Sequence, residues 1–234
     1  MKKWFLFFPL LYLNSFIANS QAAESEVRLL QMLDSTRKSF SVSKYFADIY
    51  FNTTCRAVAF FNKGPKPEKD FIQRLEIRFA FYFFRSAEAY TANDTITEVW
   101  RSYYSDSALS PLQYTLLGIN AHVNGDIFQA LVTEFSADEL KKHRSSYSKF
   151  NKALVKEYNQ FYDKWYNSHH RTQLLHTLSM GMSKFYGRTL LKKWRKRQYK
   201  LALWYYQDPD KFKILQQKVR LKRNRIDQLI LRQL

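Results

Sequence analysis

The chain has 234 residues, with 38 Lys or Arg against 20 Asp or Glu, so its formal net charge is +18 at pH 7. Hydrophobic residues make up 46%, which is enough apolar surface for a folded core and argues against intrinsic disorder. One cysteine, five glycines and five prolines exclude a disulfide scaffold and a collagen-like or Pro/Gly-rich chain. The length favours one domain, or one domain with a tail.

Residues 1–22 have the pattern of a secretory signal peptide. Two lysines precede an apolar run from Trp4 to Tyr12, and Ser20 and Ala22 are the small residues expected just before a cleavage point. An uncleaved anchor is the alternative, but the run is shorter than the ~20 apolar residues of a spanning helix. We therefore expect an exported protein, periplasmic or secreted if the source is bacterial, with no transmembrane segment after cleavage.

The rest of the chain has a helical pattern throughout. Hydrophobic residues recur at three- and four-residue spacing, and no strand–turn–strand pattern is present. We predict an all-α, aromatic-rich multi-helix bundle, with a helical domain over 23–207 and a basic amphipathic C-terminal helix over 208–234.

The expected helices start and stop at recognisable signals. Pro111 is a favoured first helical residue, Ser136 and Glu139 form a capping box, and Asp208-Pro209 stops a helix. In chain order, we predict helices around 27–33, from about 45 to 64, from 67 to about 90, around 99–103, from 111 to 135, from 137 to about 167, from about 172 to 206, and after 209.

The segment 111–135 is apolar on two broad faces, which is typical of a central helix. On ideal helix geometry two polar stripes separate these faces. One stripe holds Thr115, Gly118, His122, Asp126, Gln129 and Thr133, and the other holds the amides Gln113, Asn120 and Asn124. One stripe is expected to face solvent or a wet cavity, and the other to be buried with hydrogen-bond partners.

His122 and Asp126 are four residues apart, so their side chains are expected on the same face of the helix. This spacing lets an imidazole and a carboxylate bind one metal ion, or lets the carboxylate orient the imidazole as a general base. The alternative is a His–Asp pair that only satisfies itself or is solvated, and spacing alone favours this alternative.

The string from Gly118 to Asp126, GINAHVNGD, resembles the G-[IM]-N-A-H-[IV]-x-x-D signature of an uncharacterised family of bacterial domains of unknown function. Two further segments are similar to that family, one over 74–83 (Arg-Leu-Glu, then Phe, then Tyr-Phe) and, more loosely, one over 150–154. The resemblance covers about residues 45–204 and implies an all-helical domain, without an established activity.

The segment His122-x-x-Gly125-Asp126-x-x-Gln129 is also distantly similar to the H-x-x-G-D-x-x-Q-P-L-H segment of S1/P1-type nucleases and zinc-dependent phospholipases C. That resemblance implies a metal-assisted hydrolase of phosphoesters in which His122 and Asp126 are zinc ligands and catalytic residues.

This chain departs from that pattern in several places. Ala130 replaces the Pro, Val132 replaces the last His ligand, and there is no second H-x-x-x-D pair. The resemblance therefore implies at most one divalent ion, zinc first. Glu76, on another predicted helix, is the best candidate for a third ligand. Arg74, on the same helix as Glu76, is a weak candidate for a further site residue, not for a ligand.

The last third of the chain is strongly basic. Residues 184–234 contain 16 Lys or Arg and three acids, so this segment carries 16 − 3 = +13 of the net charge. The densest group, which we predict to bind anions, is Lys192, Lys193, Arg195, Lys196 and Arg197. Basic residues interleaved with aromatics suit anionic lipid or polysaccharide, and less so nucleic acid in an exported protein. The alternative is a solvated helix face.

Two hypotheses of function follow from the sequence. The first is an exported hydrolase of phosphoesters with a site around His122 and Asp126. The second is a non-catalytic helical protein that binds anionic surfaces through its basic C-terminal helices.

Overall fold

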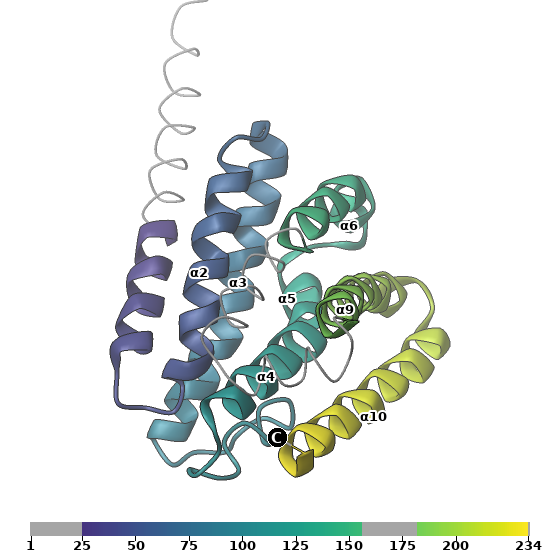
Figure 1. The fold of residues 1–234 in the computed structure, drawn as a ribbon. Helices are drawn as coiled ribbons and strands as arrows, with labels where there is room; N and C mark the ends of the chain where they lie inside the picture. Colours follow the sequence, from purple (N-terminus) through teal and green to yellow (C-terminus); the bar gives the residue numbers. More distant parts are fainter. Residues whose placement is uncertain (1–24, 156–181, 234) are drawn as a thin grey trace, which may run out of the picture.

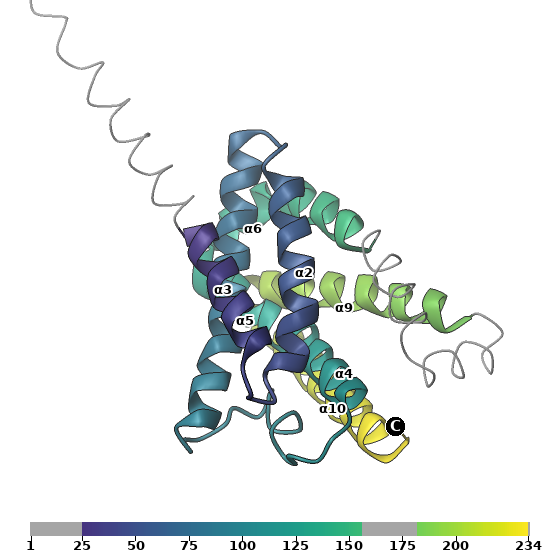
Figure 2. The same cartoon turned by 60° about the vertical axis from the view of Figure 1, so that its left-hand side comes forward.

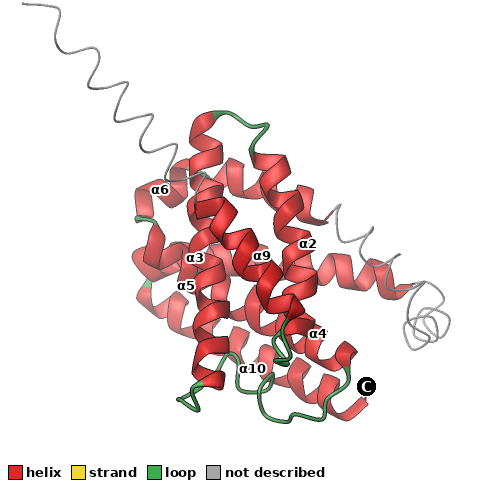
Figure 3. Cartoon of the chain, turned by 90° about the vertical axis from the view of Figure 1, so that its left-hand side faces the viewer, coloured by secondary structure: helices red, strands yellow, loops and turns green. Residues whose placement is uncertain are grey.

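The computed structural model describes residues 25–155 and 182–233. All regular elements in these ranges are helices, which confirms the predicted all-α class (Figure 3). The predicted signal peptide and the chain around 156–181 lie outside the described residues. Among the described residues, no helix combines the length and hydropathy needed to span a membrane.

Most helices of the described residues follow one another through short connections, and the longest connection lies between α3 and α4. In chain order they are a helix over 25–38, α2 (Lys44–Phe61), α3 (Lys66–Thr91), α4 (Pro111–Ala121), the π-helical turn η1 (His122–Asp126), α5 (Ile127–Glu134), α6 (Ala137–Lys142), a helix over 144–155, α9 (Met182–Gln207) and α10 (Pro209–Gln233).

The rod formed by α4, η1 and α5 is central, as predicted. On one side α4 packs against α2, and α5 packs against α3. On the other side α4 packs against α10, and α5 packs against α9 (Figures 1 and 2). Both faces of the rod are therefore covered by other helices, which is why its sequence is apolar nearly all round.

Two helix starts are fixed by local side-chain bonds. Ser136 and Glu139 form the predicted capping box, in which each side chain accepts a hydrogen bond from the backbone N–H of the other residue. Ser110 and Gln113 form a second capping box before Pro111 at the start of α4. These contacts span three residues, so sequence alone can specify them.

The predicted short helix around 99–103 is wrong. This stretch is a series of turns, in which the Trp100 N–H donates to Thr97 over 3.0 Å and the Tyr103 N–H donates to Trp100 over 3.1 Å. Both aromatic side chains are fully buried. Turns of this kind bring apolar residues to one side at three-residue spacing, as a helix does, so the sequence pattern did not separate the two.

The predicted helix over 137–167 is interrupted at His143, between α6 and the helix over 144–155. The His143 imidazole stacks on the Phe71 ring of α3, with the ring centroids 4.7 Å apart. Because the interruption coincides with this contact across the bundle, three- and four-residue periodicity within 137–167 could not indicate it. The end of the predicted helix lies outside the described residues.

Candidate functional site

The GINAHVNGD segment lies where the central rod widens into the π-turn η1. A π-turn accommodates one extra residue inside an α-helix and is frequent at functional sites. The predicted helix over 111–135 is present without a break up to Glu134, but the regular spacing of 100° per residue does not hold through η1.

Two glycines of this segment allow close packing. A Cβ on Gly118 would lie 2.5 Å from ring atoms of Phe46 in α2, and a Cβ on Gly125 would lie 2.4 Å from Cγ1 of Val99. Neither glycine has a positive φ, so close approach rather than backbone conformation accounts for them. They bring α2 and the 94–110 connection against the rod on either side of His122.

His122 and Asp126 contact each other inside the core. The Nδ1 atom of His122 lies 2.9 Å from Oδ2 of Asp126, and the indole Nε1–H of Trp100 donates to the same oxygen over 2.9 Å. The two residues are 1% and 2% exposed. The predicted contact between His122 and Asp126 is therefore present. Trp100 is a third member of this cluster that no sequence pattern indicated.

Aromatic rings enclose the imidazole. The Phe79 ring stacks on it with 3.4 Å between ring centroids, and the rings of Tyr50 and Phe46 meet it edge-on at 4.6 Å and 5.3 Å. Burial, together with the nearby charge of Arg195, lowers the pKa of His122 well below its usual value. Burial raises the pKa of Asp126, although the Trp100 hydrogen bond opposes this. The surroundings therefore favour a neutral imidazole.

Glu76 of α3 is a third buried titratable group here, as the sequence suggested. It is 5% exposed, and burial raises its pKa to about 7 against the opposing charge of Arg195. Three polar atoms of this cluster, Glu76 Oε1, His122 Nε2 and the Tyr50 hydroxyl, are among the buried atoms that have no hydrogen-bond partner in the described part of the chain. Burial raises the pKa of Tyr50 well above its usual value, and the charges of Glu76 and Asp126 raise it further.

The predicted metal ligands do not form a three-residue set within the described residues. Among the described residues, no three His, Cys, Asp or Glu side chains gather closely enough to hold a metal ion, so Glu76 does not complete a ligand set with His122 and Asp126. The Asp126 oxygen nearest the imidazole already contacts two ring nitrogens. Asp126 is thus placed to orient His122 rather than to share an ion with it.

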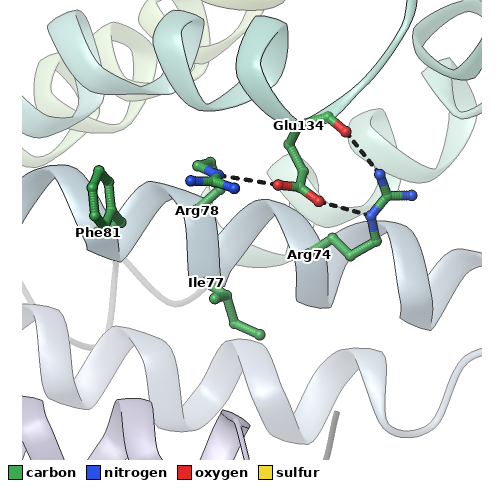
Figure 4. A pocket seen from close by; sticks show the side chains of 5 residues that line it. All are labelled: Arg74, Ile77, Arg78, Phe81 and Glu134. Atoms are coloured by element: carbon green, nitrogen blue, oxygen red, sulfur yellow. Dashed lines mark hydrogen bonds and ion pairs between the residues drawn. The ribbon is translucent and has the colours of Figure 1, made fainter. Parts of the chain in front are cut away.

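Arg74 lies in a different place, on the outer side of α3. With Ile77, Arg78, Phe81 and Glu134 it lines a surface pocket of about 310 Å³ (Figure 4). Arg74 Nε and Arg78 Nε bind the two carboxylate oxygens of Glu134 over 2.9 Å and 3.0 Å. These ion pairs tie α3 to α5, and Arg74 is not part of the His122 cluster.

The amide stripe opposite His122 holds the two C-terminal helices. Asn120 Nδ2 donates to Asp227 Oδ1 over 2.7 Å and to the Arg223 carbonyl over 3.0 Å, which attaches α10. The Gln198 side chain of α9 donates to the Asn124 carbonyl over 2.7 Å. The centres of both stripes are therefore buried, whereas the sequence predicted that one would face solvent or a wet cavity.

The predicted anion-binding group divides in the structure. Lys192, Lys193 and Lys196 are exposed, and Arg197 is half-buried. The prediction that Arg195 binds anions is corrected, because its side chain points into the bundle. Arg195 is 5% exposed, and its Nε donates to Asn151 Oδ1 over 2.5 Å. Its guanidinium lies over the rings of two core aromatics. An inward arginine satisfied in this way cannot bind a surface anion.

The long helix α10 has an outward face that combines apolar and basic side chains. The exposed members are Ile214, Lys218, Leu221, Lys222, Arg225, Leu229 and Arg232. The only acids in α10 are Asp210, in its first turn, and the buried Asp227. From Ile214 onward this face therefore has no negative charge of its own.

Comparison with known proteins supplies one match. The profile of a family of unknown function, DUF5995, matches residues 24–233, which includes every helix described above. Searches among curated proteins and among solved structures found no match.

Proposed function

We propose, from the premise that this chain belongs to DUF5995, a family of unknown function, that it binds polyanionic surfaces through α9 and α10. The single observation that supports this is a set of nine exposed cations on these helices with no acidic partner in the described part of the chain. They are Lys192, Lys193, Lys196, Lys200, Lys213, Lys218, Lys222, Arg225 and Arg232.

Several exposed lysines elsewhere are paired. Lys66 binds Asp70 and Lys149 binds Glu68, at 2.7 Å and 2.8 Å. Helix α9, in contrast, has eight Lys or Arg and no acid. Unpaired exposed cations lose little hydration when they meet an anionic surface, and each contributes about 1 kcal/mol near such a surface. Several acting together would give binding that weakens steeply with salt.

Inorganic polyphosphate is a suitable probe, since it presents only charge. We expect the chain to bind it, and the affinity to fall by at least about tenfold between about 50 mM and about 200 mM salt. The triple variant Lys192→Glu, Lys193→Glu, Lys196→Glu should bind at least about tenfold more weakly.

A matched control changes the net charge equally at exposed lysines outside these helices, Lys63→Glu, Lys142→Glu and Lys152→Glu. Binding that ignores salt, or that falls equally in both triple variants, would contradict the proposal. Binding that ignores salt would mean that the interaction is not electrostatic. Equal losses in both triple variants would mean that only the net charge of the protein matters, and not the cations of α9 and α10.

Export belongs to the same proposal. A signal peptide over 1–22 would place the chain outside the cytoplasm, where anionic lipid and polysaccharide surfaces are its neighbours. Mass spectrometry of the protein from its source cells should give a mature chain that begins at Ala23. An intact N-terminus would argue against export by cleavage.

A second candidate, hydrolysis of a phosphoester, is favoured by the unpartnered Nε2 of His122. With Asp126 holding Nδ1, the other nitrogen has the arrangement of a general base. Substrate would have to reach an imidazole that is 1% exposed, so the bundle would have to open. The test is turnover of bis(p-nitrophenyl) phosphate by the purified chain with and without added zinc. No turnover under either condition would reject this candidate.

A further inference from the structure

Helix α10 has polar side chains among its buried residues and three aliphatic side chains on its outer face. Ile214, Leu221 and Leu229 are 56%, 58% and 47% exposed, whereas Arg223 and Asp227 are 5% and 4% exposed. A helix on the surface of a water-soluble bundle ordinarily places its apolar residues toward the core. Single exposed leucines are common, but these three lie within about 80° of one another around the helix axis.

Specific bonds hold α10 in this orientation. Asp227 accepts from Asn120, and the Arg223 guanidinium donates to Glu98 Oε1 over 3.0 Å. Val219 and Ile230 are also buried on the inner side of α10, and Ile226 packs against the core beside them. Rotation of the helix to bury its outer leucines would break these bonds and leave buried charges without partners, which is strongly unfavourable.

Cations share the outward face with the three aliphatic side chains. On helix geometry Lys218, Lys222, Arg225 and Arg232 lie within about 80° of Ile214 around the axis. All four are exposed, and none has an acidic partner among the described residues. Figure 1 shows α10 along the edge of the bundle, where it packs against α4 and α9.

The mixture of cations and aliphatic side chains on this face of α10 suits some binding partners better than others. A second copy that presented the same face would bring like charges together. A nucleic acid or a polysaccharide would neutralise the cations but would leave the aliphatic side chains in contact with water. An anionic bilayer accommodates both, because apolar side chains enter the boundary between headgroups and acyl chains while lysine and arginine bind the headgroup phosphates.

We infer that the outer face of α10 docks on an anionic phospholipid bilayer, with Ile214, Leu221 and Leu229 inserted and the neighbouring cations on headgroup phosphates. This inference rests on the proposed function and names its partner. The helix lies in the plane of the interface, since its inner side stays bound to the rod.

The experiment compares the binding of the chain to lipid vesicles with its binding to polyphosphate. The chain is expected to sediment with phosphatidylcholine vesicles that contain phosphatidylglycerol, and not with phosphatidylcholine alone. The triple variant Ile214→Ser, Leu221→Ser, Leu229→Ser should lose at least about tenfold in vesicle affinity, since three aliphatic side chains no longer leave water. It should keep its affinity for polyphosphate.

The matched control replaces three exposed apolar residues on other elements, Val27→Ser, Phe60→Ser and Phe81→Ser, and should bind vesicles like the wild type. Circular dichroism checks that both variants keep their helices. A further variant, Leu221→Trp, should gain blue-shifted emission relative to the wild type with the anionic vesicles and not with polyphosphate.

The outcomes separate the two proposals. Unchanged vesicle binding by the α10 triple variant, or no blue shift in Leu221→Trp, would overturn bilayer docking and leave polyanion binding standing. Loss of polyphosphate and vesicle binding together in that variant would also overturn docking, because the aliphatic side chains would then have no bilayer-specific role. Failure of the wild type to bind either probe would overturn both proposals.

Discussion

The side-chain amide of Asn120 donates to the carboxylate of Asp227 over 2.7 Å, and these buried residues lie 107 positions apart in the chain. Burial raises the pKa of Asp227, and the hydrogen bond from Asn120 opposes this rise. The contact joins the central rod to the outermost helix of the bundle. It therefore sets which face of α10 is presented to a partner.

Replacement of Asn120 by Ala should lower the free energy of unfolding by about 1–3 kcal/mol, because Asp227 and the Arg223 carbonyl each lose a donor in a buried place. Urea denaturation followed by circular dichroism measures this. Gln228→Ala, a change at an exposed residue of α10 next to Asp227, is the control and should cost less than about 0.5 kcal/mol. Equal effects of the two changes would mean that the bond does not anchor α10.

Replacement of Asp126 by Ala should be more damaging, with a loss of about 3 kcal/mol or more. The change leaves both the Trp100 indole N–H and His122 Nδ1 without their partner in the core. Asp126→Asn keeps one oxygen, which can take the place of Oδ2 and accept from both donors, so it should lose less. Chemical denaturation of both variants gives the order, and a loss for Asn as large as that for Ala would contradict the shared-acceptor geometry.

Glu76 should make the protein less stable as the pH rises. Its folded pKa is raised from 4.5 to about 7, so between these values the folded state holds the proton more tightly than the unfolded state. The contribution of Glu76 to the free energy of unfolding is therefore highest below the pKa of the unfolded state. It falls by about 3 kcal/mol as the pH rises to the pKa of the folded state.

Glu76→Gln tests this, since the amide cannot ionise. The variant should gain stability relative to the wild type as the pH rises, with the largest difference at about pH 8. His122, whose pKa is lowered, contributes the opposite slope in both proteins, so the difference between them isolates Glu76. Parallel pH profiles of the two unfolding free energies would refute the assignment.

Tyr50→Phe should be neutral or slightly stabilising, by up to about 1 kcal/mol, because the hydroxyl is buried and has no partner in the described part of the chain. Thermal unfolding measures the effect, with Tyr103→Phe as the contrast. The Tyr103 hydroxyl donates to the Val42 carbonyl over 2.8 Å, so its removal should destabilise. A marked loss from Tyr50→Phe would contradict this prediction, because it would mean that the hydroxyl makes a stabilising hydrogen bond.

Gly125→Ala should cost about 1–3 kcal/mol, because the new Cβ would lie 2.4 Å from Val99 Cγ1. Val99→Ala removes the methyl groups that cause the clash, so the double variant should lose less than the sum of the two single variants. A double-mutant cycle in urea gives this coupling. Additive losses would mean that Gly125 is required for another reason.

Sequence alone determined the features that depend on near neighbours. Apolar spacing of three and four residues indicated a helical protein, and Ser136 with Glu139 indicated a helix start that the structure contains. The four-residue spacing of His122 and Asp126 indicated a contact that forms. Near Trp100 and His143 the same reasoning failed, since turns and an interruption preserve apolar spacing.

Tertiary structure decided everything that joins distant parts of the chain. It placed Trp100 on Asp126, turned Arg195 inward, and replaced one turn of the central helix by η1. It also decided which side of α10 faces outward, through the bond between Asn120 and Asp227. The physical reason is that periodicity reports which residues of one helix share a face, whereas the partner of that face comes from residues far away in the sequence.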